Sequence, residues 1–190
     1  MKEQLEYYIR NQLKNPKEAE IKEILALFEL EHFQKGEYFK RHDKSFSKLG
    51  FLLQGRMQHY IVKHGDKEMT IRISQKNAFV TDILCLRTKA KTPISIKALE
   101  PTSMLVAAGE AINDLAETNL TLNRLLREYM GENIEKQAEL YFLFMTGTAK
   151  ERYKFILENN PELLKNTPLR FIASMIGITP TQLSRIRNKK

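Results

Sequence analysis

The sequence predicts an α+β protein: an N-terminal β-roll with flanking helices, one long helix, and a small all-α C-terminal domain containing a helix-turn-helix. Three patterns carry this prediction. Short β-branched and aromatic runs alternate with turn residues over 31–108, apolar residues recur every three or four positions over 110–146, and capped short helices follow. We expect domain boundaries at 1–110, 111–146 and 147–190.

The first 30 residues show a helical period. Residues 2–30 are expected to be helical, and Pro16 divides them into two segments. The strand-like runs that follow include a hairpin-like turn at His64–Lys67. Several short strands at this spacing favour a small barrel or roll, because closure protects strand edges.

The next segment, 110–146, lacks proline and contains one glycine, Gly131. Its apolar period predicts a long helix, preceded by a short one that ends near Thr118. The long helix exceeds what a small domain needs for its own core, so we expect it to pair with its copy in a homodimer. A helix that packs only on its own roll remains an alternative, since Asn133 and either Lys136 or Gln137 interrupt the heptad pattern.

Three helix starts are marked by capping residues. Thr148 and Glu151 have the spacing of a capping box, in which each side chain satisfies a backbone amide of the other. Thr167-Pro168 and Thr179-Pro180 each place an N-cap hydroxyl before a proline at the first helical position. These caps predict short, well-delimited helices after the long one.

The last segment, Pro168–Lys190, has the spacing of a helix-turn-helix. Ala173 is small where two helices would cross, and Gly177 suits the positive φ at the start of the turn. Leu183 and Ile186 are expected to hold the second helix against the first. An ordinary helical hairpin with a basic surface is the alternative interpretation.

The charge is concentrated in the same region. The chain carries +8, and residues 147–190 hold nine Lys and Arg against three Glu, with no acid after Glu162. Such a block favours a polyanionic partner, nucleic acid ahead of membrane, over a solvated tail. Arg and Gln can make bidentate contacts to guanine and adenine. The expected DNA contacts are Thr179, Thr181, Gln182, Ser184, Arg185, Arg187, Lys189 and Arg170.

The sequence lacks the features that are typical of several other protein classes. Cys85 is the only cysteine, which excludes an intrachain disulfide and a cysteine-ligated cluster within one chain. No apolar run exceeds five residues, and the N-terminus has no signal-peptide core, so we expect a cytoplasmic protein. The four histidines lack metal-ligand spacing. There is no phosphate loop or nucleophile elbow, so we predict no catalytic residue, metal or cofactor, and no enzyme.

The order of a roll, a long helix and a helix-turn-helix resembles the Crp/Fnr family of bacterial transcription regulators. Its most specific part is Ile172–Arg187, which is similar to the Bacteroidetes-type subgroup whose recognition helix ends in Leu-Ser-Arg-Ile-Arg. Phe142–Thr148 resembles the family's hinge, and Gly36, Gly55 and the Gly65-Asp66 turn resemble glycines of its cyclic nucleotide-binding roll. The resemblance implies a jelly-roll effector domain, a dimerisation helix, and a homodimer on a two-fold related double-stranded DNA site.

The ligand pocket departs from the family pattern. The family uses Phe-Gly-Glu, and about ten residues later an arginine that neutralises the cyclic phosphate. Here the corresponding segments are Phe79-Val80-Thr81-Asp82 and Thr92-Pro93, so the charge-assisted pair with phosphate is lost. We predict a degenerate pocket, with an unidentified small-molecule effector or none. Its residues are Phe79, Val80, Thr81, Asp82, Thr92 and Pro93.

Two further functions remain open from the sequence. The chain could be a small-molecule sensor or binding module whose basic C-terminal helices do not bind specific DNA. An RNA or non-specific nucleic-acid binder is disfavoured, because the sequence lacks the aromatic clusters on which bases stack.

Overall fold

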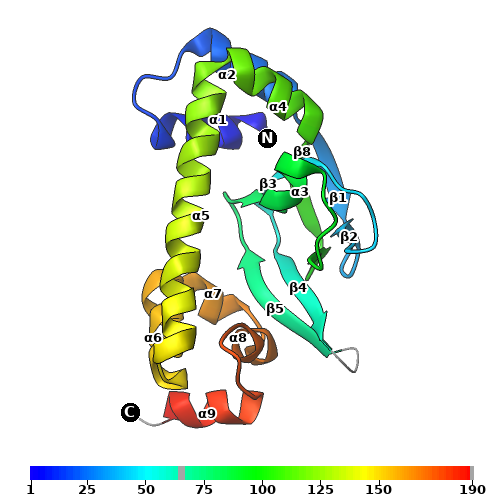
Figure 1. Ribbon diagram of the computed structural model, residues 1–190. Coiled ribbons are helices and arrows are strands. Elements are labelled where there is room, and N and C mark those ends of the chain that lie inside the picture. Colours follow the sequence, from blue (N-terminus) through cyan, green and yellow to red (C-terminus); the bar gives the residue numbers. More distant parts are fainter. Residues whose placement is uncertain (64–66, 189–190) are drawn as a thin grey trace. The chain divides into compact units, whose positions relative to one another are not determined.

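The computed structural model describes residues 1–63 and 67–188 (Figure 1). His64, the predicted Gly65-Asp66 turn, Lys189 and Lys190 lie outside the described residues. The chain folds as two compact units, a first unit of Met1–His59 with Ser74–Gly131 and a second unit of Tyr60–Ile73 with Glu132–Lys190. The predicted mixed architecture of a roll, a long helix and C-terminal helices is confirmed. Within the described ranges, no helix is both long and apolar enough to cross a bilayer.

The first unit begins with helices α1 (Lys2–Gln12) and α2 (Glu18–Ala26). The chain then enters strand β1 (Glu29–Phe33), so the prediction that helix extends to residue 30 is wrong at its end. Leu30 pairs with Leu105 of a neighbouring strand. This tertiary ladder outweighs the local helical period.

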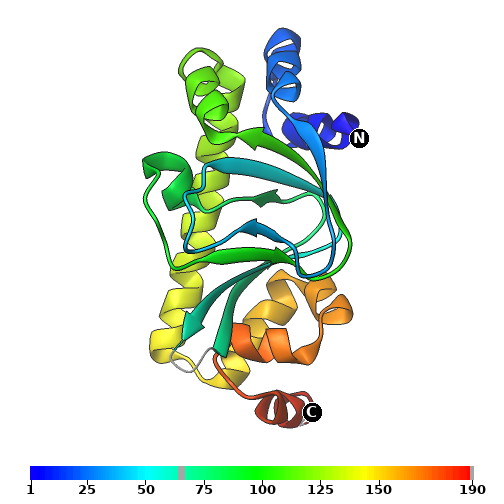
Figure 2. The ribbon, with the colours of Figure 1, turned by 90° about the vertical axis from the view of Figure 1, so that its right-hand side faces the viewer.

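The strands of the described chain form two four-stranded sheets (Figure 2), with the orders β1-β8-β3-β6 and β2-β7-β4-β5. Each strand pair whose register is defined, such as β1 with β8 and β3 with β6, is antiparallel. The remaining strands are β2 (Tyr38–Lys40), β3 (Lys48–Gln54), β4 (Met57–Lys63), β5 (Lys67–Ser74), β6 (Phe79–Val80), β7 (Ser95–Ala98) and β8 (Thr102–Ala108).

Strand β8 is buried on both of its faces. Met104 and Val106 lie in a cluster contributed by strands of both sheets, whereas Leu105 and Ala107 lie in a second cluster shared with the helices. Successive side chains of a strand point to opposite faces, so a doubly covered strand needs an apolar residue at every position. This explains the continuous apolar run that the sequence shows here.

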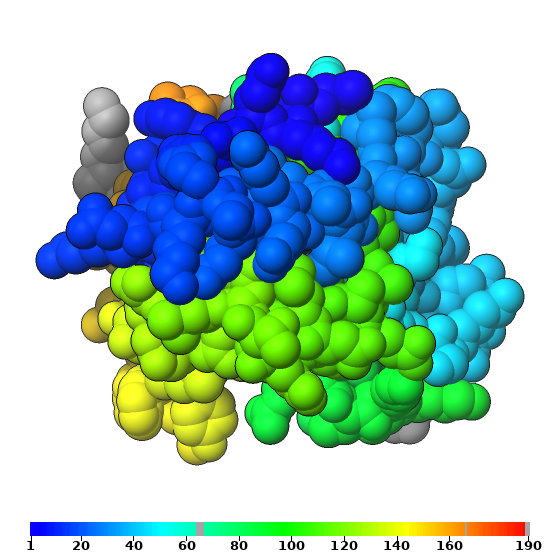
Figure 3. Space-filling model, turned by 90° about the horizontal axis from the view of Figure 1, so that it is seen from above, coloured from blue at the N-terminus to red at the C-terminus, as the bar shows by residue number. Residues whose placement is uncertain are grey.

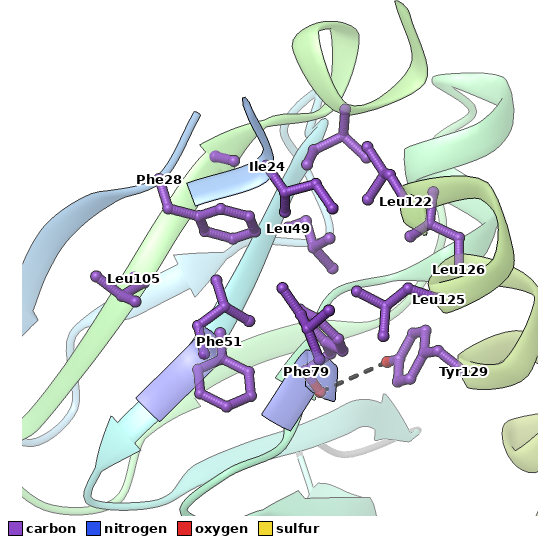
Figure 4. Close-up of a cluster of buried hydrophobic side chains, with 14 of the residues drawn as sticks. Ile24, Phe28, Leu49, Phe51, Phe79, Leu105, Leu122, Leu125, Leu126 and Tyr129 are labelled. Atoms are coloured by element: carbon purple, nitrogen blue, oxygen red, sulfur yellow. Dashed lines mark hydrogen bonds between the residues drawn. The ribbon is translucent and has the colours of Figure 1, made fainter. Parts of the chain in front are cut away.

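The long helix contributes to the second of these clusters (Figure 4). Leu122, Leu125 and Tyr129 point toward the strands, and the Tyr129 hydroxyl donates to the Phe79 carbonyl oxygen at 3.5 Å. The Phe79 and Tyr129 rings also meet edge to face, with centroids 5.3 Å apart. The start of the long helix is therefore anchored in the core of the first unit.

Two helices form this segment, α4 (Gly109–Thr118) and α5 (Leu120–Thr146), as the sequence predicts. The α4–α5 junction lies against the N-terminal helices (Figure 3). The Asn119 side-chain amide donates to the Glu20 carbonyl at 3.0 Å, and the Thr121 hydroxyl donates to the Glu20 carboxylate at 2.6 Å. These bonds connect the first and last helical parts of the first unit.

The second unit contains four further helices. Thr148 and Glu151 form the predicted capping box at the start of the first of them. The predicted N-cap at Thr167 is wrong, because Pro168 takes the N-cap position with an extended ψ of 136°. The helices are α6 (Ala149–Asn159), α7 (Pro161–Asn166), α8 (Leu169–Met175) and α9 (Pro180–Asn188).

Candidate nucleic-acid interface

Helices α8 and α9 pack as the predicted helix-turn-helix. Ala173 and Leu183 are fully buried, so the small side chain lets the second helix approach the first. Gly177 has φ +72°, in the left-handed region that favours glycine. The Ile178 amide donates to the Ala173 carbonyl at 3.0 Å, which closes the end of α8. The turn geometry expected from the sequence is confirmed.

Helix α9 begins with a capping box that the sequence analysis did not identify. The Gln182 amide donates to the Thr179 hydroxyl at 3.2 Å, and the Thr179 amide donates to the Gln182 side-chain oxygen at 2.9 Å. The box satisfies two amides at the start of the helix. It also occupies the side-chain oxygen that a bidentate contact from Gln182 to adenine would require.

The outer face of α9 is polar and cationic. The helix has no acidic residue, and Arg185 and Arg187 lie in its last turn. Arg170 of α8 is also exposed, with its guanidinium 4.8 Å from the centre of the Phe171 ring. Lys189 was predicted to contact DNA and lies outside the described residues. The exposed predicted contacts on or beside α9 are Thr179, Thr181, Gln182, Ser184, Arg185 and Arg187.

Arg152 has a structural role that the number of basic residues in 147–190 did not indicate. Its guanidinium donates to the Ile176 carbonyl and to the Gly147 carbonyl, both at 2.9 Å. It also lies 4.9 Å from the centre of the Phe144 ring. A cation on the last carbonyls of a helix is favoured by the helix dipole. Arg152 therefore connects the end of α5, the start of α6 and the end of α8.

Two further cations of the basic block are paired with carboxylates. Lys154 lies 3.5 Å from Glu158, and Lys165 lies 2.6 Å from Glu162. Together with Arg152, these residues reduce the cationic surface that the net charge indicated. The part of the basic segment that contains no acidic residue is its C-terminal end, which includes α9.

The predicted ligand pocket contains a buried ion pair instead of an open phosphate site. The Lys40 ammonium lies 3.3 Å from the Asp82 carboxylate, and both side chains are almost completely buried. It donates to the Thr92 hydroxyl at 3.0 Å and to the Ile94 carbonyl at 2.5 Å. The Thr92 hydroxyl in turn donates to Asp82. All three polar side chains are thus satisfied by one another.

Asp82 is also the N-cap of helix α3 (Ile83–Thr88), a helix that the sequence analysis did not predict. Its carboxylate accepts the amides of Leu84 and Cys85 at 3.1 and 3.2 Å. Burial alone would raise the pKa of Asp82. The hydrogen bonds from Thr92 and Cys85 and the charge of Lys40 outweigh burial and hold this pKa below its usual range.

The other predicted pocket residues do not join this cluster. Phe79 packs in the cluster beneath the helices, Val80 lies between the sheets, and Pro93 is exposed. The Thr81 hydroxyl donates to the Lys48 carbonyl at 2.8 Å. Of the six residues, the structure brings together Asp82 and Thr92, with Lys40 as a third member that the sequence analysis missed.

Cys85 and three of the four histidines lie among the described residues. Cys85 is buried, its thiol donates to the Ala90 carbonyl at 2.9 Å, and burial raises the pKa of the thiol. His59 is buried beside the Ser74 hydroxyl at 3.0 Å, whereas His32 and His42 are exposed. Within 1–63 and 67–188, no group of three or more His, Cys, Asp or Glu side chains is arranged to hold a metal ion.

Comparison with known proteins agrees with this geometry. The family model of the cyclic nucleotide-binding domain matches residues 30–119. FixK2 from Bradyrhizobium japonicum has a similar structure, with a TM-score of 0.73 at 16% identity over 85% of this chain and 83% of that chain. No curated protein sequence is significantly similar to this chain.

Two other solved structures match most of the chain. CLP from Xanthomonas campestris, a c-di-GMP-responsive global regulator, gives a TM-score of 0.69 at 14% identity, covering 91% of each chain. A putative Crp/Fnr-family transcriptional regulator from Eubacterium rectale gives 0.68 at 18% identity, covering 95% of this chain and 85% of that one.

The fold and the site define a class of protein: a cyclic nucleotide-binding-type roll joined by a long helix to a helix-turn-helix. This architecture is similar to that of solved Crp/Fnr-type regulators, so the resemblance inferred from the sequence is confirmed at the level of the fold.

Proposed function

We propose that the chain is a transcription regulator that binds specific double-stranded DNA as a homodimer through α9. The observation that carries the proposal is the outer face of α9. It presents Thr181, Ser184 and Arg185 to solvent on a capped helix without a single acid. A recognition helix reads base edges in the major groove with residues near its N-terminal end. We assign Arg187 and Arg170 to contacts with phosphates.

The second half of α5 supports the homodimer. Buried residues of the helix end at Tyr129, and beyond it Ile134, Tyr141 and Met145 are 69%, 61% and 68% exposed. Spacings of seven and four place these side chains along one stripe of a helix. Apolar residues in this pattern are typical of a helix that pairs with another. We assign this stripe to contact with a second copy of the chain.

The cluster of Lys40, Asp82 and Thr92 supports a roll that does not bind cyclic nucleotides. The resemblance assigns the phosphate-binding arginine to the position of Thr92. Here the hydroxyl of Thr92 is already bound, and the Asp82 carboxylate beside it would repel a phosphate. The Lys40 ammonium is already paired with the Asp82 carboxylate, so it does not replace the arginine. The proposed regulator therefore uses no cyclic-nucleotide effector.

The test is a selection from random duplex DNA with the purified chain at near-physiological salt, without added ligand. We expect an enriched palindrome whose half-sites lie about 34 Å apart, one turn of the double helix. A protein that binds all sequences equally, or none, would contradict the proposal of specific recognition. The small-molecule binding module would then become the better assignment.

A parallel measurement addresses the effector. Thermal unfolding is followed with and without millimolar cAMP, cGMP or c-di-GMP, because a ligand that binds only the native state stabilises it by an amount that grows with the logarithm of ligand concentration. We expect no shift in Tm for any of them. A concentration-dependent rise would show that the polar cluster opens to admit a phosphate, and would overturn this part of the proposal.

A further inference from the structure

A cavity lies wholly within the second unit. Its volume is about 240 Å³, and its walls come from β5, the second half of α5, and the end of α8 with the following turn. The backbone of Gly177 also lines it. The apolar side chains around it are Met69, Ile71, Leu140, Tyr141, Phe144 and Met175.

The polar groups of this cavity are few. The Thr70 amide donates to the Ser174 hydroxyl at 2.9 Å, which connects β5 to α8 at the cavity edge. Gln137 contributes one side-chain amide from α5. A ligand here would meet two aromatic rings, two thioethers and branched aliphatic groups, with few groups available for hydrogen bonding. Such a site favours apolar molecules with a single polar group.

Its size limits the ligand. A dry cavity of about 150 Å³ lined by aliphatic and aromatic side chains holds benzene, so 240 Å³ corresponds to roughly ten non-hydrogen atoms. This is the size of a fused bicyclic ring or a short acyl chain. Met69 and Met175 are flexible and can adjust to such shapes.

The cavity has a direct connection to the helix-turn-helix. Met175 and Gly177 belong to the end of α8 and its turn, while Met69 and Leu140 belong to β5 and α5. A bound molecule would add contacts between these elements without covering the exposed face of α9. Any ligand that favours one placement of α8 changes the affinity for DNA by the same factor that DNA changes the affinity for the ligand.

We propose that this cavity binds a small, largely apolar molecule, and that its occupancy changes the affinity of the regulator for DNA. The predicted effect on DNA affinity rests on the proposed function. The site is separate from the polar cluster of the roll, since every residue that lines it belongs to the second unit.

Indole is a suitable probe, because it has the right size and the chain contains no tryptophan. Indole fluorescence can therefore be excited selectively in the presence of the protein's tyrosines. We expect saturable binding to the full chain with a blue-shifted emission. Two variants fill the cavity from different walls, Leu140→Phe and Ile71→Phe, and each should weaken binding at least tenfold. Glu135→Phe adds the same side chain at an exposed position of α5 outside the cavity, and should bind indole like the wild type.

Circular dichroism and Tm show whether each variant is folded, and at least one folded filling variant is needed. Absence of saturable binding, or equal binding by the filled and unfilled proteins, would overturn the site. This titration contains no DNA, so its result is independent of the proposed function.

The DNA half of the proposal uses the duplex obtained by selection. We expect saturating indole to change the Kd for this duplex at least threefold in the wild type and to leave it unchanged in Leu140→Phe. An unchanged Kd in the wild type at full indole occupancy would overturn the regulatory role of the cavity.

Discussion

The two polar regions of this protein use their charges in opposite ways. In the first unit, Lys40 and Asp82 are buried and face each other, with Thr92 between them. In the second unit, Arg185 and Arg187 are exposed on a helix without acids. Neither pattern follows from net charge alone. A buried charge must keep its partner, because loss of one partner leaves the other uncompensated, whereas charges presented to solvent remain available for a polyanion.

This difference reverses what the family resemblance suggests. In the family, the roll is expected to bind a ligand phosphate at the position that Thr92 takes here. The helix-turn-helix is expected to change its DNA binding in response. Here the polar cluster of the roll is complete without a ligand. The exposed cationic face of α9 is the surface proposed to contact DNA. The following predictions separate the two regions by the property that each change affects.

The largest effect is expected for Lys40→Met. It leaves the Asp82 carboxylate buried without its cation, and breaking a buried pair costs about 3–5 kcal/mol in free energy of unfolding. Urea unfolding measures the loss. The matched control is the double variant Lys40→Met with Asp82→Asn, which keeps the N-cap of α3 but removes both charges. It should recover a substantial part of the loss, and equal losses in both proteins would contradict the pairing.

Arg185→Ala should affect DNA recognition and leave the fold intact. If Arg185 contacts guanine with two hydrogen bonds, its loss costs about 1–3 kcal/mol of discrimination at one base pair. Competition binding with single-base variants of the selected site measures this value. Arg187→Ala is the control and should weaken binding to all sequences. The same uniform weakening for Arg185→Ala would assign that residue to the phosphates instead.

Gly177→Ala tests the turn that places α9. At φ +72° a Cβ is disfavoured by about 1–2 kcal/mol, and it would lie 3.1 Å from the Phe144 ring. Thermal unfolding should show a lower Tm. Gly131→Ala provides the comparison, since a Cβ there meets nothing within 4 Å and alanine is the better helix former. Stabilisation by both substitutions would show that the turn does not require a positive φ.

The smallest effect concerns pH. Because the folded pKa of Asp82 lies below its usual value, the unfolded chain binds more protons as the solution becomes acidic. The stabilisation is fully present above the unfolded pKa and is lost as pH falls through the folded pKa. Urea unfolding between pH 7 and pH 3 should therefore show a stability difference between wild type and the double variant that shrinks in acid. A difference that stays constant would mean that Asp82 does not titrate as a paired group.

Much of the fold was predictable because its signals are local. The long helix, its short predecessor ending at Thr118, and the capping box of Thr148 and Glu151 each depend on residues within a few positions. The roll was recognised from strand lengths and turns. One error occurred where a distant partner decided the outcome, at Leu30, which pairs with Leu105 instead of extending α2. Another was local, since Pro168 and not Thr167 takes the N-cap position of α8.

The candidate site divides in the same way. The helix-turn-helix could be predicted from Ala173, Gly177 and the Thr179 cap, because its geometry needs these residue types at fixed spacing. The polar cluster could not. Lys40 and Thr92 are 52 positions apart, and a lysine in a three-residue strand gives no local sign that it is buried.

The amino-acid pattern alone predicted most of the helices and the roll, the position of the helix-turn-helix, and a second helix without acidic residues. These properties follow from backbone propensity, capping and periodicity, all of which act over short distances along the chain. Which charges pair inside the protein depended on long-range contacts that the sequence pattern does not show. Lys40 meets Asp82, and Arg152 meets the carbonyls of Gly147 and Ile176, because folding brings distant residues together and removes water from between them.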